Sequence, residues 1–147
     1  MTYLDTSAII KRFVAEKGSV FIDSLVHQPE SVATASIAYA EVYAGLTRRR
    51  REGRLSPTQY GVVCRQFETD WHAYTRVALA DEILALAKHL IQRHPLRGFD
   101  AIHLASALRL KSSLTVGITF GAADRQLLRA ARDEGLHTVD VEMTQDR

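Results

Sequence analysis

Residues 3–14 read Tyr-Leu-Asp-Thr-Ser-Ala-Ile-Ile-Lys-Arg-Phe-Val. The apolar pair Tyr3-Leu4 ends at Asp5, and apolar residues at helical spacing follow from Ala8 onward, so this stretch predicts a short buried strand that turns directly into a helix. Asp5 then lies at the strand–helix junction. In open parallel sheets, ligands bind beyond such junctions, at the carboxyl ends of the strands.

The same alternation of short apolar runs and helical patterns continues along the chain. Further strands are expected at residues 32–34, 77–79, 114–120 and 138–141, and helices at 8–14, 21–26, 37–53, 57–71, 81–94, 99–110 and 123–134. Ser36 is an expected helix cap, and Ser56-Pro57 is an expected helix start. Strands that alternate with helices predict an α/β fold, with a mostly parallel central sheet of about five strands covered by helices on both faces.

Length and composition limit the class of protein. The 147 residues fit a single domain, residues 1–147. No apolar run approaches the roughly 20 residues that span a bilayer, and the N-terminus lacks the basic and apolar regions of a secretory signal, so a cytoplasmic chain with no membrane contact is expected. Cys64 is the only cysteine, which excludes an internal disulfide and a thiolate metal cage and fits a reducing compartment.

Four carboxylates lie where an apolar stretch begins or ends: Asp5, Glu41, Asp100 and Asp124. Glu41 has only small and apolar helical neighbours at three and four residues, so its side chain requires a partner. The three aspartates could also be helix caps or first-turn acids. If the fold gathers the four groups, each pair about 4 Å apart costs about 4 kcal/mol at an effective dielectric near 20. A hard divalent cation is the expected compensation.

Basic residues gather near the end of the expected helix 37–53, namely Arg48, Arg49, Arg50, Arg51 and Arg54. They form either a solvated helix end or a patch that contacts phosphate. Successive helical residues point about 100° apart, so the adjacent arginines cannot all face one ligand. The formal net charge of +2 does not indicate nucleic-acid binding by itself. His103 is expected to pack or to form a hydrogen bond rather than to bind metal.

Four segments in this order resemble the motifs of PIN-domain nucleases, and most closely those of VapC-type toxins from toxin–antitoxin pairs: residues 4–8, 40–42, 99–105 and 123–128. The sequence Asp-Ala-Ile-His-Leu-Ala at 100–105 is the most specific of these. One position differs from the family pattern, because many members have Ser or Thr where this chain has Ala122. The resemblance therefore defines the role of Asp124 least well.

The resemblance implies a PIN-like three-layer α/β/α sandwich and a metal-dependent endoribonuclease that hydrolyses RNA phosphodiester bonds with water activated by Mg²⁺ or Mn²⁺. Asp5 and Asp100 are then the principal metal ligands, and Glu41 is a ligand or the base that orients water. Asp124 is an outer ligand or binds a second metal. Thr6 or Ser7 is expected to bind the scissile phosphate or the metal-bound waters.

The resemblance also implies partners. Such toxins are usually homodimers, inhibited by a small DNA-binding antitoxin that covers the acidic pocket, often with an arginine. A guanidinium offers donors in a fork that matches carboxylates. The expected role is therefore that of the toxin in such a pair.

Other functions are compatible with parts of this sequence pattern. A haloacid-dehalogenase-like phosphatase requires a second aspartate two residues after Asp5, where this chain has Ser7. A nuclease for flapped DNA usually has additional helical elements, for which the chain has no obvious room. A housekeeping RNA-processing PIN nuclease and a catalytically inactive RNA- or protein-binding module on the same fold remain alternatives. The presence of all four acids argues against the inactive module.

Overall fold

The central sheet of the computed structural model contains five strands within the described residues, 1–143; the last four residues of the expected domain, 144–147, lie outside them. All neighbouring strands are parallel, in the order β3-β2-β1-β4-β5. The strands are β1 (Thr2–Leu4), β2 (Val32–Ala35), β3 (Thr75–Val77), β4 (Thr119–Ala122) and β5 (His137–Asp140). The prediction of an α/β fold around a parallel five-stranded sheet is confirmed.

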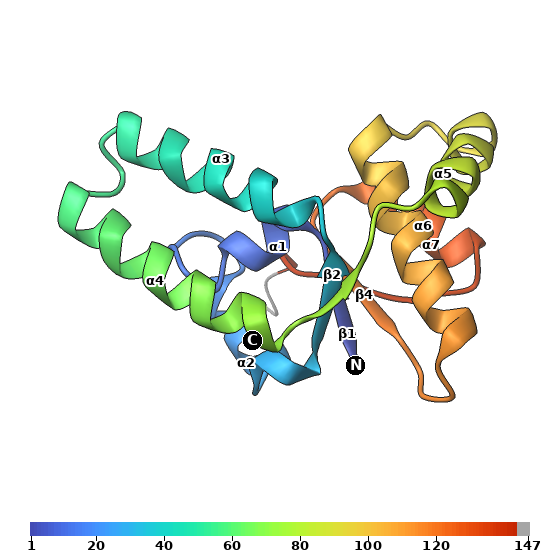
Figure 1. Ribbon diagram of the computed structural model, residues 1–147, viewed down its shortest axis with the longest axis horizontal. Helices are drawn as coiled ribbons and strands as arrows, with labels where there is room; N and C mark the ends of the chain where they lie inside the picture. The colour runs from blue at the N-terminus through green and yellow to red at the C-terminus, as the bar shows by residue number, and fades with distance from the viewer. Residues whose placement is uncertain (144–147) are drawn as a thin grey trace.

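Helices cover both faces of this sheet (Figure 1). One side carries α1 (Thr6–Ile10), α2 (Ser19–Leu25), the short 3₁₀ helix η1 (Pro29–Ser31), α3 (Ala38–Arg51) and α4 (Pro57–Ala73). The other side carries α5 (Asp81–Arg93), α6 (Gly98–Ser113) and α7 (Arg125–Asp133). No helix within residues 1–143 is long and apolar enough to cross a bilayer.

The two cores follow from the alternation of side chains along the strands. Tyr3 belongs to the hydrophobic cluster that includes residues of α5, α6 and α7, whereas Leu4 belongs to the cluster with residues of α1 to α4. The Tyr3 ring also stacks on Phe120 of the neighbouring strand β4, with the ring centroids 5.4 Å apart. The predicted three-layer α/β/α sandwich is therefore present.

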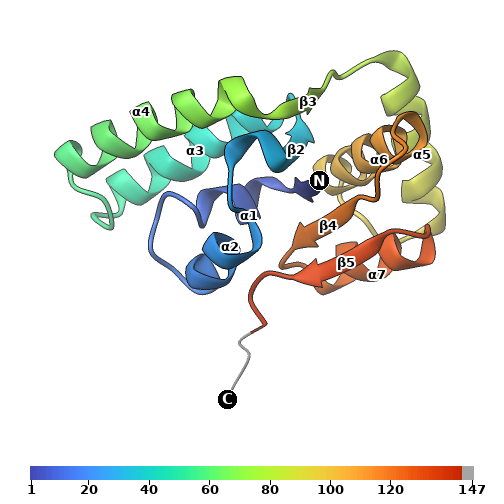
Figure 2. The same ribbon diagram turned by 90° about the horizontal axis from the view of Figure 1, so that it is seen from below.

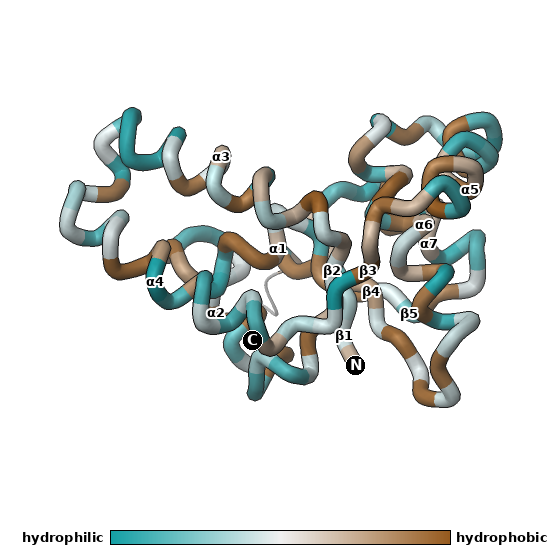
Figure 3. Tube along the Cα trace, viewed as in Figure 1, coloured by the Kyte–Doolittle hydropathy of each residue, from teal (hydrophilic) through white to brown (hydrophobic). Residues whose placement is uncertain are grey.

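Helices α3 and α4 project together beyond the sheet (Figures 1 and 2). Hydrophilic residues mark the outer end of α3 (Figure 3), where Arg48 to Arg51 form its last turn. The chain reverses there, and α4 begins with a capping box in which Ser56 and Gln59 each accept a hydrogen bond from the other's backbone N–H. The predicted start at Ser56-Pro57 is confirmed.

Two predicted element boundaries on the β2–β3 side of the sheet were wrong. Ser36 is not a helix cap, because its backbone N–H donates to the Val77 carbonyl at 2.9 Å and so continues the pairing with β3; helix α3 starts only at Ala38. Strand β3 covers Thr75–Val77 instead of residues 77–79. Its extent is set by pairing with residues 33–35 of β2 rather than by its own apolar content.

Two further predicted boundaries also differ from those in the structure. The run 114–120 forms a strand only from Thr119, because β4 pairs with the three residues of β1. Helix α1 ends at Ile10 instead of residue 14, and the next N–H groups, of residues 11 to 13, bond carbonyls three residues back. This tighter turn closes the first helix early.

Candidate active site

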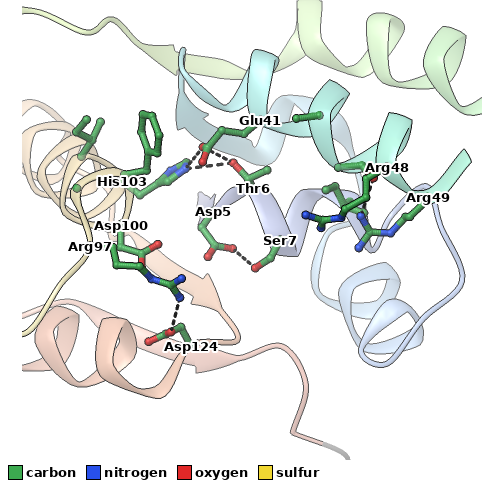
Figure 4. A pocket seen from close by; sticks show the side chains of 16 residues that line it. Asp5, Thr6, Ser7, Glu41, Arg48, Arg49, Arg97, Asp100, His103 and Asp124 are labelled. Carbon is green, nitrogen blue, oxygen red and sulfur yellow. Dashed lines mark hydrogen bonds and ion pairs between the residues drawn. The ribbon is translucent and has the colours of Figure 1, made fainter. Parts of the chain in front are cut away.

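One pocket of about 760 Å³ is lined by all six predicted site residues (Figure 4): Asp5, Thr6, Ser7, Glu41, Asp100 and Asp124. It lies beyond the carboxyl ends of β1 and β4, where the sequence placed Asp5 and Asp124. Helices α3 and α6 bring Glu41 and Asp100 to the same place. The structure thus gathers residues from four separate parts of the chain.

Asp5 occupies the N-cap position of α1, as one of its two sequence interpretations expected. Its Oδ1 accepts hydrogen bonds from the backbone N–H of Ala8 and from the Ser7 hydroxyl, both at 3.0 Å. Burial raises the pKa of Asp5, and these bonds together with the nearby His103 oppose the rise only in part. Asp5 is therefore both a helix cap and a buried pocket carboxylate.

Glu41 has the partners that its apolar helix face required. Its Oε1 accepts from the Thr6 hydroxyl at 2.6 Å and lies 2.9 Å from Nε2 of His103. Burial alone would raise the pKa of Glu41, but the hydrogen bonds from His103 and Thr6 outweigh it and the pKa is lowered. Glu41 is thus held as a carboxylate, with its direction set by two side chains.

His103 connects this carboxylate to the core. Its Nδ1 lies 2.8 Å from the hydroxyl of Tyr3, and His103 is only 2% exposed. Burial raises the pKa of Tyr3, so its hydroxyl stays protonated and can donate to Nδ1 while Nε2–H donates to Glu41. This assignment, inferred from the hydrogen-bond network, satisfies both ring nitrogens. The structure agrees with the expectation that His103 forms hydrogen bonds.

Asp100 and Asp124 share a cationic neighbour, Arg97. The guanidinium of Arg97 lies 3.7 Å from Asp100 Oδ2 and 3.8 Å from Asp124 Oδ2. Asp124 caps α7 through Oδ1, which accepts from the backbone N–H of Leu127 at 2.9 Å. Burial raises the pKa of Asp100, the charge of Asp124 raises it further, and Arg97 offsets part of the rise. The two aspartates therefore repel each other within the pocket.

The donor set fits a hard divalent cation in its chemistry. Mg²⁺ prefers oxygen ligands, and the pocket presents three aspartates and one glutamate. The raised pKa values of Asp5 and Asp100 show that the site disfavours their negative charge, which a cation would offset. As the side chains are placed, no three Asp, Glu, His or Cys groups within residues 1–143 lie together closely enough to hold a metal ion. Coordination by three of these side chains at once would therefore require side-chain rotation, whereas one or two carboxylates with water do not.

Three features of this pocket were not predicted from the sequence. Tyr3 acts through a contact 100 positions away, which no local pattern reveals. Arg97 was overlooked, although its place three residues before Asp100 in a helical first turn was a usable signal. Of the arginine cluster, only Arg48 and Arg49 line the pocket.

Comparison with known proteins gives a consistent result. The PIN domain family model matches residues 2–133. Ribonuclease VapC45 of Mycobacterium tuberculosis (strain CDC 1551 / Oshkosh) is 31% identical over 143 residues, which cover 97% of both chains.

Two solved structures share the fold at low sequence identity. A chain from a structure of FitAB bound to an IR36 DNA fragment aligns with a TM-score of 0.69 and 16% identity, covering 100% of this chain and 99% of that one. A chain of a toxin–antitoxin complex from Klebsiella pneumoniae aligns with a TM-score of 0.61 and 16% identity, covering 86% of this chain and 89% of that one.

Proposed function

This chain belongs to the PIN-domain family and is related to the VapC ribonucleases, and from that premise we propose that it is an endoribonuclease acting as the toxin of a toxin–antitoxin pair. The observation that carries the proposal is the meeting of Asp5, Glu41, Asp100 and Asp124 in one pocket. Their position beyond the carboxyl ends of parallel strands is the usual place for a catalytic site in this architecture.

Each acidic residue has a role that its surroundings support. Asp5 and Asp100 are the principal ligands of Mg²⁺ or Mn²⁺, and Asp124 is an outer ligand or binds a second ion. Such a cation, when bound, activates water and stabilises negative charge on the phosphate. Glu41, held as a carboxylate by His103 and Thr6, is a ligand or accepts the proton of the attacking water.

The hydroxyl groups of Thr6 and Ser7 donate hydrogen bonds to pocket carboxylates. A hydroxyl has one proton to donate, and Thr6 donates to Glu41 while Ser7 donates to Asp5. Contact of either hydroxyl with the scissile phosphate, as the sequence suggested, therefore requires that bond to be exchanged when substrate binds. Until then the two hydroxyls orient Glu41 and Asp5.

The proposed partners follow from the same pocket and the family. RNA is the substrate, and the inhibitor is a small DNA-binding antitoxin whose chain covers the acidic residues. We further propose a homodimer of single-domain chains that acts in the cytoplasm, where its RNA substrate is found.

Cleavage of RNA by the purified protein tests this function. We expect cleavage with Mn²⁺ or Mg²⁺, and its loss in EDTA. Asp5→Asn and Asp100→Asn keep the side-chain size but remove one ligand charge, so each should lose nearly all cleavage while its circular dichroism spectrum is unchanged. Asp23, exposed on α2 and outside the pocket, provides the matched control Asp23→Asn, which should remain active.

Several outcomes would contradict the proposal. Cleavage that continues undiminished in EDTA excludes the metal-dependent mechanism. Full activity of Asp5→Asn or Asp100→Asn excludes that residue as an essential ligand. An active enzyme that does not slow growth on expression points instead to an RNA-processing nuclease.

A further inference from the structure

Phe99 is an aromatic side chain that the fold does not bury. It is 59% exposed, it lines the pocket, and it follows Gly98 in the first turn of α6, next to Asp100. Nine other large hydrophobic residues are exposed within residues 1–143, and none of them lines this pocket. Phe99 is absent from both hydrophobic clusters of the described chain and stacks on none of its aromatic rings.

The opposite wall of the pocket contributes Arg48. Helix α3 presents Glu41, Ala44, Gly45 and Arg48 to the pocket, which is the spacing i, i+3, i+4 and i+7 of one helical face. Ala44 and Gly45 leave little side-chain volume between the charged ends. At 1.5 Å per residue, Arg48 lies about 10 Å along the helix axis from Glu41. Figure 4 shows Arg48 on the α3 side of the pocket, at the opposite end from Arg97.

Arg49 and Arg50 of the cluster already contact other side chains of the protein. Arg49 is buried and donates to Glu16 and to the Gly45 carbonyl. Arg50 lies over the Tyr60 ring, with its Cζ 4.4 Å from the centroid. Among the side chains of residues 1–143, neither Arg48 nor Arg51 has a hydrogen-bond or ion-pair partner, but only Arg48 faces the pocket. Arg48 is therefore available to a ligand in the pocket, whereas Arg51 is not.

We propose that the pocket binds a single RNA strand between α3 and α6, with Arg48 holding a backbone phosphate and Phe99 stacking on an unpaired base. A guanidinium fork matches phosphate geometry, and bases of single-stranded RNA stack on aromatic side chains. The four acidic residues line the same pocket as these two contacts. Paired bases of duplex RNA are not available for such stacking, so the Phe99 contact should make a duplex bind more weakly than a single strand. This inference rests on the ribonuclease function proposed above.

The phosphate contact is tested with Arg48→Gln and the charge-matched control Arg51→Gln. Binding of a fluorescently labelled single-stranded RNA is measured by anisotropy in EDTA over a range of salt concentrations. Arg48→Gln should weaken binding severalfold and reduce the slope of log K against log salt by about 0.7, the contribution of one phosphate contact in a single strand. Arg51→Gln should change neither. Equal effects of the two substitutions would overturn the assignment of Arg48.

The stacking contact is tested with two substitutions at one position. Phe99→Leu keeps an apolar side chain but removes the ring, and should weaken binding about fivefold or more. Phe99→Tyr keeps the ring and should bind as the parent does. A duplex of the same sequence should bind more weakly than the single strand. Parent-like binding by Phe99→Leu, or equally tight binding of duplex, would overturn the stacking role.

Failure of this inference can be distinguished from failure of the function. If the parent protein neither binds nor cleaves RNA, the ribonuclease proposal itself fails. If the parent binds and cleaves RNA but Arg48→Gln and Phe99→Leu bind it normally, the function stands and the proposed path of the strand is wrong. Circular dichroism of each variant shows whether it is folded, and both substituted side chains are exposed.

Discussion

The carboxylate of Glu41 depends on residues from three other elements of the chain. Thr6 of α1 and His103 of α6 contact Oε1, and His103 is fixed in turn by Tyr3 of β1. Bonds to the ionised carboxylate outweigh the cost of burying it, so the pKa of Glu41 is lowered. An ionised carboxylate with a fixed direction is therefore present in the pocket near neutral pH.

Asp100 is in the opposite situation, and this leads to a prediction about stability and pH. Its pKa is raised by burial and by Asp124. The folded state therefore retains a proton that the unfolded state loses, and Asp100 lowers stability as pH rises from its ordinary pKa to the raised one. In EDTA, Asp100→Asn should match or exceed the parent in melting temperature at pH 7, and the difference should shrink near pH 4.

Differential scanning fluorimetry at several pH values checks this expectation. Asp23→Asn, on the exposed surface of α2, is the control for the loss of one negative charge. A first-turn acid that merely stabilised α6 through the helix dipole would give the opposite sign, because its removal costs about 0.3–1 kcal/mol. A clear loss of stability in Asp100→Asn at pH 7 would therefore identify a structural role.

At the scale of elements, two glycines share a left-handed backbone conformation but differ in how closely other atoms approach them. Gly18 precedes α2 with φ 94°, and Gly53 follows α3 with φ 76°. A methyl group on Gly53 would meet no atom within 4 Å, whereas one on Gly18 would overlap the backbone carbonyl oxygen of Val141, next to β5. The close approach therefore joins the start of α2 to the chain after the last strand.

We expect different costs for the two alanine substitutions. Gly53→Ala should destabilise the protein by about 1–2 kcal/mol, the cost of left-handed backbone for a residue with a Cβ. Gly18→Ala adds overpacking against a backbone atom, typically about 1–3 kcal/mol, and should cost about 3 kcal/mol in total. Urea unfolding measures both values. Equal losses would show that the chain around Val141 moves freely away from Gly18.

At the scale of the whole molecule, a cation bound by the pocket should couple four segments of the chain. An ion present at a hundred times its dissociation constant stabilises the folded state by about 2.7 kcal/mol if it does not bind the unfolded chain. For a chain of this size, that corresponds to a rise in melting temperature of about 5–10 °C. We expect this rise with Mn²⁺ and its reversal by EDTA.

The double variant Asp5→Asn, Asp100→Asn is the matched comparison, because it lacks both proposed principal ligands. Its melting temperature should not respond to Mn²⁺. A similar response in the variant and the parent would place the ion elsewhere on the protein, and no response in the parent would argue against a resident divalent ion. This readout does not depend on RNA cleavage.

Local patterns in the sequence were sufficient for most of the architecture. The alternation of strands and helices, the capping box at Ser56 and the caps formed by Asp5 and Asp124 all depend on residues within a few positions of one another. The same patterns placed the four acids at the ends of apolar stretches. That is why the fold class could be predicted without coordinates, whereas the grouping of the four acids with Thr6 and Ser7 in one site was predicted from the resemblance to PIN-domain nucleases.

Tertiary structure alone decided which strand residues pair and which pocket side chains meet. The start of β4 and the position of β3 follow from their neighbours β1 and β2. Contacts of His103 with Tyr3, Thr6 and Glu41 join positions 100, 97 and 62 residues apart. Likewise, only the folded chain shows that Arg48 lines the pocket and Arg51 does not. The physical reason is the distance along the chain over which each interaction acts. Helix caps and hydrophobic periodicity involve residues within one or two helical turns, whereas strand pairing and ion contacts depend on where packing brings distant segments together.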